Sequence, residues 1–151
     1  SPEDSNELAR GIKTLSLRLD RQIANVKELV NYLQGLGEVK KIYYPGIKGL
    51  PGYQELRQEA KGAGGVFSFE LTESVDPVKF VNNLRLFKLA VSLGAVESLV
   101  ELPSKMSHAE LSPEEQLAAG IKPGLIRMAV GIEDFHDQIA DIQQAIAKSR
   151  K

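Results

Sequence analysis

The feature that most constrains the fold is the spacing of apolar residues, which changes along the chain between a helical period and a period of two. Over residues 2–36 apolar side chains recur every three or four positions, and this spacing predicts helical structure. Gly11 interrupts the pattern, so two helices that meet near residues 11–14 are an alternative to one long helix. Residues 66–71 instead alternate apolar and polar side chains, which is typical of a strand with one buried face.

Turn and cap residues divide the rest of the chain into short elements. Further strands are expected over 39–44, 88–93 and 125–130, and helices over 53–61, 97–102 and 113–120, with one more helix from Asp76-Pro77 and a last one from Glu133-Asp134. This order predicts an α/β fold, with a mixed sheet of about four strands and helices mostly on one face.

Composition narrows the classes of function. The net charge of −1 gives no electrostatic reason to expect nucleic acid or an anionic membrane surface as a partner. The chain has no cysteine, which excludes disulfides, a thiol nucleophile and a cysteine-ligated zinc site. No apolar run approaches the roughly 20 residues needed to cross a bilayer. We therefore expect a soluble, cytoplasmic domain that has no membrane partner.

Most motifs that carry chemistry are missing. His108 and His136 are too far apart to show metal-ligand spacing, so no metal site is predicted. His136 is expected at the surface, whereas His108 either fixes its loop or lines a site. The glycines of 62–65 precede a strand and do not open a helix, which argues against a phosphate-binding loop.

Two segments stand out physically. Arg127 lies inside the apolar run 125–130, where a buried cation needs an anionic partner, either a ligand or an internal acid. Residues 90–94 end a predicted strand in a glycine turn, which can present backbone amides and the Ser92 hydroxyl to a carboxylate, or can be a plain turn.

The same two segments carry a resemblance to a known family. Residues 91–99 resemble the S-L-G-x-x-E-S-L signature of the transsulfuration-type enzymes that depend on pyridoxal phosphate (PLP), and residues 124–134 resemble their G-L-I-R-L-S-V-G-I-E-D segment. Four shorter matches follow the family's order and cover nearly the whole chain, at 10–18, 44–46, 103–108 and 113–120. The family includes cystathionine γ-synthases, cystathionine lyases, methionine γ-lyases and O-acylhomoserine sulfhydrylases.

The resemblance implies a fold and a division of the chain. It implies the small C-terminal domain of fold-type I PLP enzymes, with a mainly antiparallel four-stranded sheet and helices on its outer face. Residues 1–36 would form the linking helix region, and residues 37–151 the substrate-binding domain. The lysine that binds PLP stands, in the family, in an upstream segment that has no match here, and neither Lys13 nor Lys105 replaces it. The isolated chain is therefore expected to hold no PLP and to be inactive, and its partners would be the missing large domain and the copies in a homotetramer.

The resemblance also implies roles for residues. Arg127 would bind the α-carboxylate of a sulfur amino-acid substrate, and Ser92 with the backbone of Leu93 would help to hold it. Ser107 stands where threonine is usual and keeps its hydroxyl, while Ala129 stands where serine is usual. Val91 stands where members that act on cystathionine often have glutamate, which tilts the expected specificity toward a smaller or less polar substrate.

Three functions remain open from the sequence. The leading one is part of a PLP-dependent enzyme that makes or breaks carbon–sulfur bonds in sulfur amino acids. A second is a non-catalytic binding or oligomerisation module with the same fold. The third is a purely structural domain in which Arg127 pairs with an internal acid.

Overall fold

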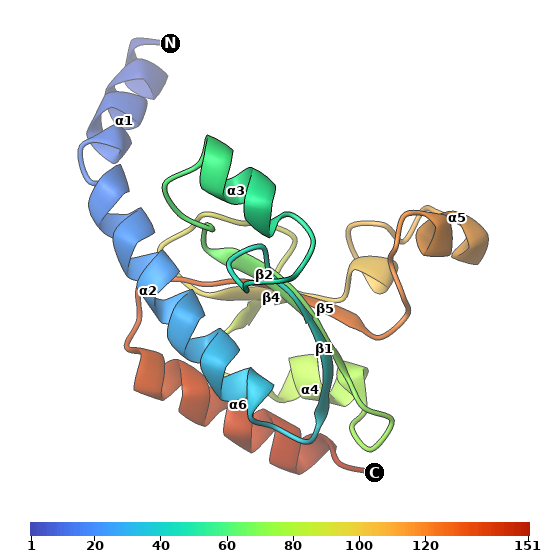
Figure 1. Ribbon diagram of the computed structural model, residues 1–151. Helices are drawn as coiled ribbons and strands as arrows, with labels where there is room; N and C mark the ends of the chain where they lie inside the picture. The colour runs from blue at the N-terminus through green and yellow to red at the C-terminus, as the bar shows by residue number, and fades with distance from the viewer.

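A computed structural model describes residues 1–151. It is built from six α-helices, five strands and one short 3-10 helix (Figure 1). In chain order these are α1 (Pro2–Ile12), α2 (Leu15–Gln34), β1 (Val39–Tyr43), α3 (Tyr53–Glu59), β2 (Val66–Leu71), α4 (Pro77–Asn83), β3 (Lys88–Leu89), β4 (Leu99–Glu101), η1 (Pro103–Lys105), α5 (Pro113–Ala118), β5 (Leu125–Ala129) and α6 (Phe135–Ser149).

The strands form a single sheet in the order β1-β2-β5-β4-β3. Three of its pairings are antiparallel, and only the short β3–β4 pairing is parallel. The predicted α/β class and the mainly antiparallel character of the sheet are confirmed. The sheet has five strands, however, where four were expected.

The extra strand comes from a wrong prediction at residues 97–102. A helix was expected there, but Leu99–Glu101 forms β4, which is bonded to β5 on one side and to β3 on the other. A short apolar run fits either structure locally, and here the pairing partners decide. The predicted strand 88–93 was too long, because only Lys88 and Leu89 pair with β4 and residues 90–98 form a loop.

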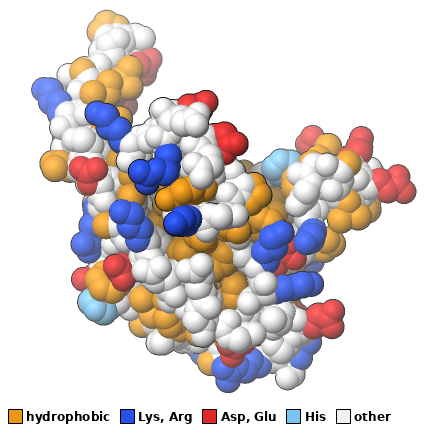
Figure 2. Space-filling view, viewed as in Figure 1, with side chains coloured by type: hydrophobic (Ala, Val, Ile, Leu, Met, Phe, Trp, Pro, Cys, Tyr) orange, Lys and Arg blue, Asp and Glu red, His pale blue; other side chains and the backbone are white.

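The N-terminal helical segment divides as Gly11 suggested. α1 ends at Ile12 and α2 begins at Leu15. α1 has no buried residue and projects away from the body, whereas α2 buries one side against the sheet (Figure 1). Figure 2 shows hydrophobic side chains exposed on the projecting α1. No helix is both long enough and apolar enough to cross a membrane.

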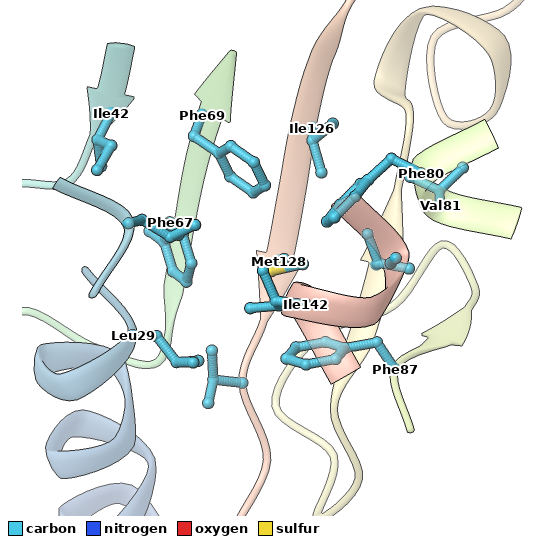
Figure 3. Packing of buried hydrophobic residues seen from close by; sticks show 14 of the residues in the cluster. Leu29, Ile42, Phe67, Phe69, Phe80, Val81, Phe87, Ile126, Met128 and Ile142 are labelled. Carbon is cyan, nitrogen blue, oxygen red and sulfur yellow. The ribbon is translucent and has the colours of Figure 1, made fainter. Parts of the chain in front are cut away.

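The core lies between one face of the sheet and a layer formed by α2, α4 and α6 (Figures 1 and 3). Phe67 and Phe69 of β2 stack on each other, and the Phe69 ring meets the edge of Phe80 from α4. Ile126 and Met128 of β5 point into the same layer (Figure 3). Because side chains alternate along a strand, the residues between these ones lie on the opposite face. The candidate site lies there.

Candidate functional site

Arg127 lies on the face of the sheet opposite the core. It is the middle residue of β5, between the buried residues Ile126 and Met128. The strand register places Ser68 of β2 beside it on one side and Glu101 of β4 on the other. The sheet therefore puts an arginine next to an acid on neighbouring central strands.

Arg127 and Glu101 form an ion pair. The Arg127 Nη1 atom lies 2.9 Å from Oε1 of Glu101. The Glu101 side chain is only 1% exposed, whereas that of Arg127 is 23% exposed. The internal acid that the sequence left open is thus present, and the guanidinium still reaches the surface.

The two segments that the sequence singled out come together at this guanidinium. The Arg127 Nη2 atom donates a hydrogen bond of 3.1 Å to the backbone carbonyl of Ser92. The contact uses the Ser92 carbonyl and not its hydroxyl. The backbone N–H groups of Ser92 and Leu93 have no partner within the chain. Val91 and Leu93, on either side of Ser92 in the chain, are 53% and 60% exposed, so they are surface residues and not core residues.

Ser107 joins the same group through Glu101. Its hydroxyl donates to Glu101 Oε1 at 3.1 Å and lies 2.8 Å from Nδ1 of His108. His108 therefore contacts the loop hydroxyl, as the loop-fixing alternative expected. By contrast, His136 is exposed and bonds to Asp134 at the start of α6, away from this group.

A buried polar network fixes the far end of the loop 90–98. The Glu133 carboxylate accepts from the backbone and hydroxyl of Ser98 at 2.7 and 2.8 Å, and from Gln138 at 3.0 Å. Asn25 of α2 donates to the carbonyls of Gly131 and Glu133. A Cβ atom on Gly131 would lie 2.3 Å from the Val96 carbonyl oxygen, so only glycine allows this close approach. The loop that carries Ser92 is therefore tied to both α2 and the end of β5.

A second polar cluster lies on the same face, nearer the edge of the sheet. Glu70 of β2 accepts from the Tyr43 hydroxyl and from Lys122 Nζ, which lies 2.9 Å from Oε1. Burial alone would raise the pKa of Glu70, but these hydrogen bonds outweigh it and lower the pKa. Figure 2 shows basic and acidic side chains gathered over β1 and β5. No hydrogen bond or ion pair joins this cluster to Arg127, so it serves as an internal comparison for the Glu101 pair.

The glycine-rich stretch 62–65 has a packing role. A Cβ atom on Gly62 would lie 2.9 Å from Ile23, and one on Gly65 would lie 3.2 Å from Gln22. Both contacts are with α2, which crosses close to the start of β2. Close packing against α2 therefore favours glycine at these two positions.

Sequence reasoning missed Glu101, Ser98 and Glu133 as parts of this arrangement. Glu101 carried a usable signal, since it is the single acid in the apolar run 99–103, as Arg127 is the single cation in 125–130. An apolar run with a single acid and another with a single cation favour two adjacent strands in which the acid and the cation lie opposite each other. The helix predicted over 97–102 hid that match.

The comparison with known families decides the relationship. The sequence model of the Cys/Met metabolism PLP-dependent enzymes matches residues 1–147. The chain belongs to this family.

Relatives within the Cys/Met metabolism family are similar over nearly all of the chain. The L-methionine gamma-lyase of Pseudomonas putida is 45% identical over 150 residues, which are 99% of this chain and 38% of that protein. The cystathionine beta-lyase of Lactococcus lactis subsp. cremoris (strain MG1363) is 44% identical over 147 residues, 97% of this chain and 39% of that protein. The chain therefore spans about two fifths of the length of these relatives.

The fold agrees with a solved member of the family. The crystal structure of cystathionine gamma-lyase from Lactobacillus plantarum, complexed with L-serine, superposes with a TM-score of 0.94 at 40% sequence identity. It covers 99% of this chain and 39% of that one. The expected fold is confirmed, apart from the number of strands.

The residues present do not form a cradle for the family's PLP cofactor. Every lysine of the chain is exposed, and Lys122 is engaged by Glu70. The single buried aspartate, Asp141, accepts hydrogen bonds from the backbone N–H groups of Arg85, Leu86 and Phe87. These hydrogen bonds complete a helix–loop junction, so the Asp141 carboxylate is not free to pair with a pyridine nitrogen. No chemical step is therefore assigned to PLP within this chain.

Proposed function

We propose that the chain is the C-terminal part of a PLP-dependent enzyme that makes or breaks carbon–sulfur bonds in sulfur amino acids. In this proposal residues 1–36 link it to a large domain that binds PLP, and residues 37–151 are the substrate-binding domain. The family match over residues 1–147, combined with relatives more than twice as long, supports a further domain outside this chain. When bound, PLP supplies the electron sink for such reactions, and residues of this chain bind the substrate.

Arg127 binds the α-carboxylate of the substrate in this proposal. The observation that supports this assignment is that the Arg127 guanidinium is bound by groups of the protein and is still partly exposed. Glu101 and the Ser92 carbonyl engage Nη1 and Nη2, while Nε has no partner in the chain. A planar guanidinium can meet both oxygens of a carboxylate at once, which fixes the orientation of the substrate as well as its charge.

Ser92 and Leu93 complete the carboxylate site. Their backbone N–H groups are free and lie in the loop whose carbonyl contacts Arg127. Backbone N–H groups are good donors to an anion because they are already fixed in place. Ser107 supports the site indirectly, by donating to the acid that pairs with Arg127.

Val91 is proposed as a specificity residue. It is exposed beside Ser92 and offers an apolar surface to the distal part of a substrate. An apolar surface does not pair with the distal amino group of cystathionine, whereas it suits the thioether of methionine. We therefore propose a preference for L-methionine over L-cystathionine.

The working enzyme is proposed to be a cytoplasmic homotetramer that contains the large domain. The 151-residue chain alone would then bind no PLP and catalyse no reaction. Its own residues would bind and orient the amino acid, while proton transfer at the α-carbon would fall to groups in the large domain.

The test is to record the visible absorption of the protein expressed from its complete reading frame, and to supply three substrates. These are L-methionine, L-cystathionine, and O-acetyl-L-homoserine with sulfide, with keto-acid and thioether products measured for each. An absorbing cofactor with turnover, fastest on L-methionine, is the expected result. Neither absorption nor turnover would contradict the proposal and favour a non-catalytic binding or assembly module. The 151-residue chain is the matched control, and it should show neither signal.

A further inference from the structure

Glu101 is the most deeply buried acid of the chain, and it is only partly satisfied. Its side chain is 1% exposed, and Oε1 faces Arg127 and accepts from Ser107. The other oxygen, Oε2, is buried and has no hydrogen-bond partner. A buried carboxylate with an unpaired oxygen is costly, so the fold tolerates this arrangement at a price in stability.

Glu70 shows how an acid on the same face can be satisfied. Tyr43 and Lys122 both contact Oε1 of Glu70, and Lys122 also reaches Oε2 at 3.3 Å. Both of its oxygens are therefore engaged. Of these two acids, only Glu101, the partner of Arg127, keeps a carboxylate oxygen without a hydrogen bond. Arg127 reaches the surface, so water can solvate its charge without an internal acid.

The Ser107 hydroxyl helps to orient the Glu101 carboxylate. It has a single proton, and a carboxylate can only accept, so its bond to Glu101 leaves the hydroxyl oxygen as an acceptor for His108. That arrangement requires the proton of the imidazole to sit on Nδ1. The result is a chain of donors that runs from His108 through Ser107 to Glu101 and fixes the carboxylate behind the guanidinium.

We propose that Glu101, supported by Ser107, is a positioning residue that orients the Arg127 guanidinium for a substrate carboxylate. The inference rests on the proposed function of Arg127. Glu101 does not touch the substrate in this account. It engages Nη1 from the interior while the Ser92 carbonyl engages Nη2, and the two contacts together hold the guanidinium plane in one orientation. Without Glu101 the flexible arginine side chain would sample several orientations, and the paired contact with a carboxylate would weaken.

The experiment compares a ligand that has the α-carboxylate with one that lacks it. The full-length holoenzyme is mixed rapidly with L-methionine or with its decarboxylated amine, 3-(methylthio)propylamine, and the affinity for each is taken from the change in visible absorption of the bound PLP before turnover begins. The preference for L-methionine measures how well the carboxylate is held. A loss of general stability would weaken both ligands and leave the ratio of their affinities unchanged.

Three variants share one design. Glu101→Met removes the charge and the acceptor at similar volume, Glu101→Gln keeps an acceptor oxygen, and Glu70→Met makes the matched change in the acid that does not contact Arg127. We expect Glu101→Met to lower the preference for L-methionine by about tenfold or more, the loss of one charge-assisted contact. Glu101→Gln should retain the preference within about threefold, and Glu70→Met should leave it at the wild-type value.

The outcomes separate this inference from the function on which it rests. An unchanged preference in Glu101→Met, or an equal loss in Glu70→Met, overturns the positioning role while leaving the carboxylate site intact. A wild-type enzyme that binds both ligands equally, and that Arg127→Met leaves unaltered, overturns both. If Glu101→Met does not fold, Ser107→Ala takes its place. Ser107→Ala should lower the preference for L-methionine by about threefold, whereas Ser107→Thr should keep it. Equal preferences in these two variants would contradict the proposal.

Discussion

The two faces of the central sheet are built from the same strands and serve different ends. On β2 the ring of Phe69 is buried in the helical layer, while its neighbours Ser68 and Glu70 face the other way. On β5 the same alternation separates Ile126 and Met128 from Arg127. One face is stabilised by apolar burial, and the other by pairs of opposite charge.

The apolar face fixes the positions of the side chains on the polar face. Every residue of the polar face is one peptide unit from a buried residue, so the packed core fixes where each polar side chain begins. A strand that slipped by one residue would bury Arg127 and expose Met128 at the same time. The core therefore protects the register on which the Arg127–Glu101 pair depends.

Truncation of one residue on each face of β2 should give the largest difference in stability between the two faces. Phe69 is completely buried between Phe67 and Phe80, so Phe69→Ala should lower the free energy of unfolding by about 3–5 kcal/mol. Ser68→Ala on the other face should change it by less than about 0.5 kcal/mol. Urea denaturation of the 151-residue chain measures both. Similar losses in the two variants would mean that the faces do not differ as described.

Substitution in the polar network that joins the loop 90–98 to the end of β5 should cause the next largest loss of unfolding free energy. Glu133→Ala would leave the backbone N–H and the hydroxyl of buried Ser98 without their acceptor, and would remove one of the two acceptors of the Gln138 amide, so we expect a loss of about 2–4 kcal/mol. Glu97→Ala, on the exposed part of the same loop, is the control and should have almost no effect. Chemical denaturation compares the two variants, and an equal response would rule out the network as the anchor.

Acid should weaken the polar face before it affects the apolar one. The pKa of Glu70 is lowered in the folded protein, so its contribution to stability is complete above the ordinary glutamate value of 4.5 and is lost as the pH falls through the lower folded value. The unfolding free energy of the wild type should therefore fall more steeply below that pH than that of Glu70→Gln. Denaturation curves recorded from pH 6 down to about pH 3 test this. Parallel curves for the two proteins would contradict the assignment.

The smallest effect is expected in α1, which belongs to neither face. Leu8 is exposed and α1 buries no residue, so Leu8→Ala should change the unfolding free energy by less than about 0.5 kcal/mol. The corresponding change in α2, Leu29→Ala, should cost about 3 kcal/mol or more because Leu29 is completely buried. Thermal or urea unfolding distinguishes them, and a large effect of Leu8→Ala would mean that α1 packs within this chain.

Much of the fold follows from local signals in the sequence, and the failures have a common cause. The helix predicted over 113–120 is present as Pro113–Ala118, and its start is marked by a capping box between Ser112 and Glu115, a signal that depends only on residues a few positions apart. β4 could not be recognised, because three residues that pair with β5 look the same locally as a turn of helix. The same mistake hid Glu101. Arg127 could be predicted because a lone cation in an apolar strand requires a partner, whereas the identity of that partner depends on strand order.

The most direct test of the account is the catalytic efficiency of Arg127→Lys on L-methionine in the full-length enzyme. Lysine keeps the positive charge and loses the planar pair of donors, so a carboxylate-binding role predicts that kcat/KM falls by about a hundredfold, chiefly through a higher KM. The melting temperature should stay close to that of the wild type, since Arg127 is partly exposed. A kcat/KM within about threefold of the wild type would contradict the central claim and leave the Arg127–Glu101 pair as a structural ion pair.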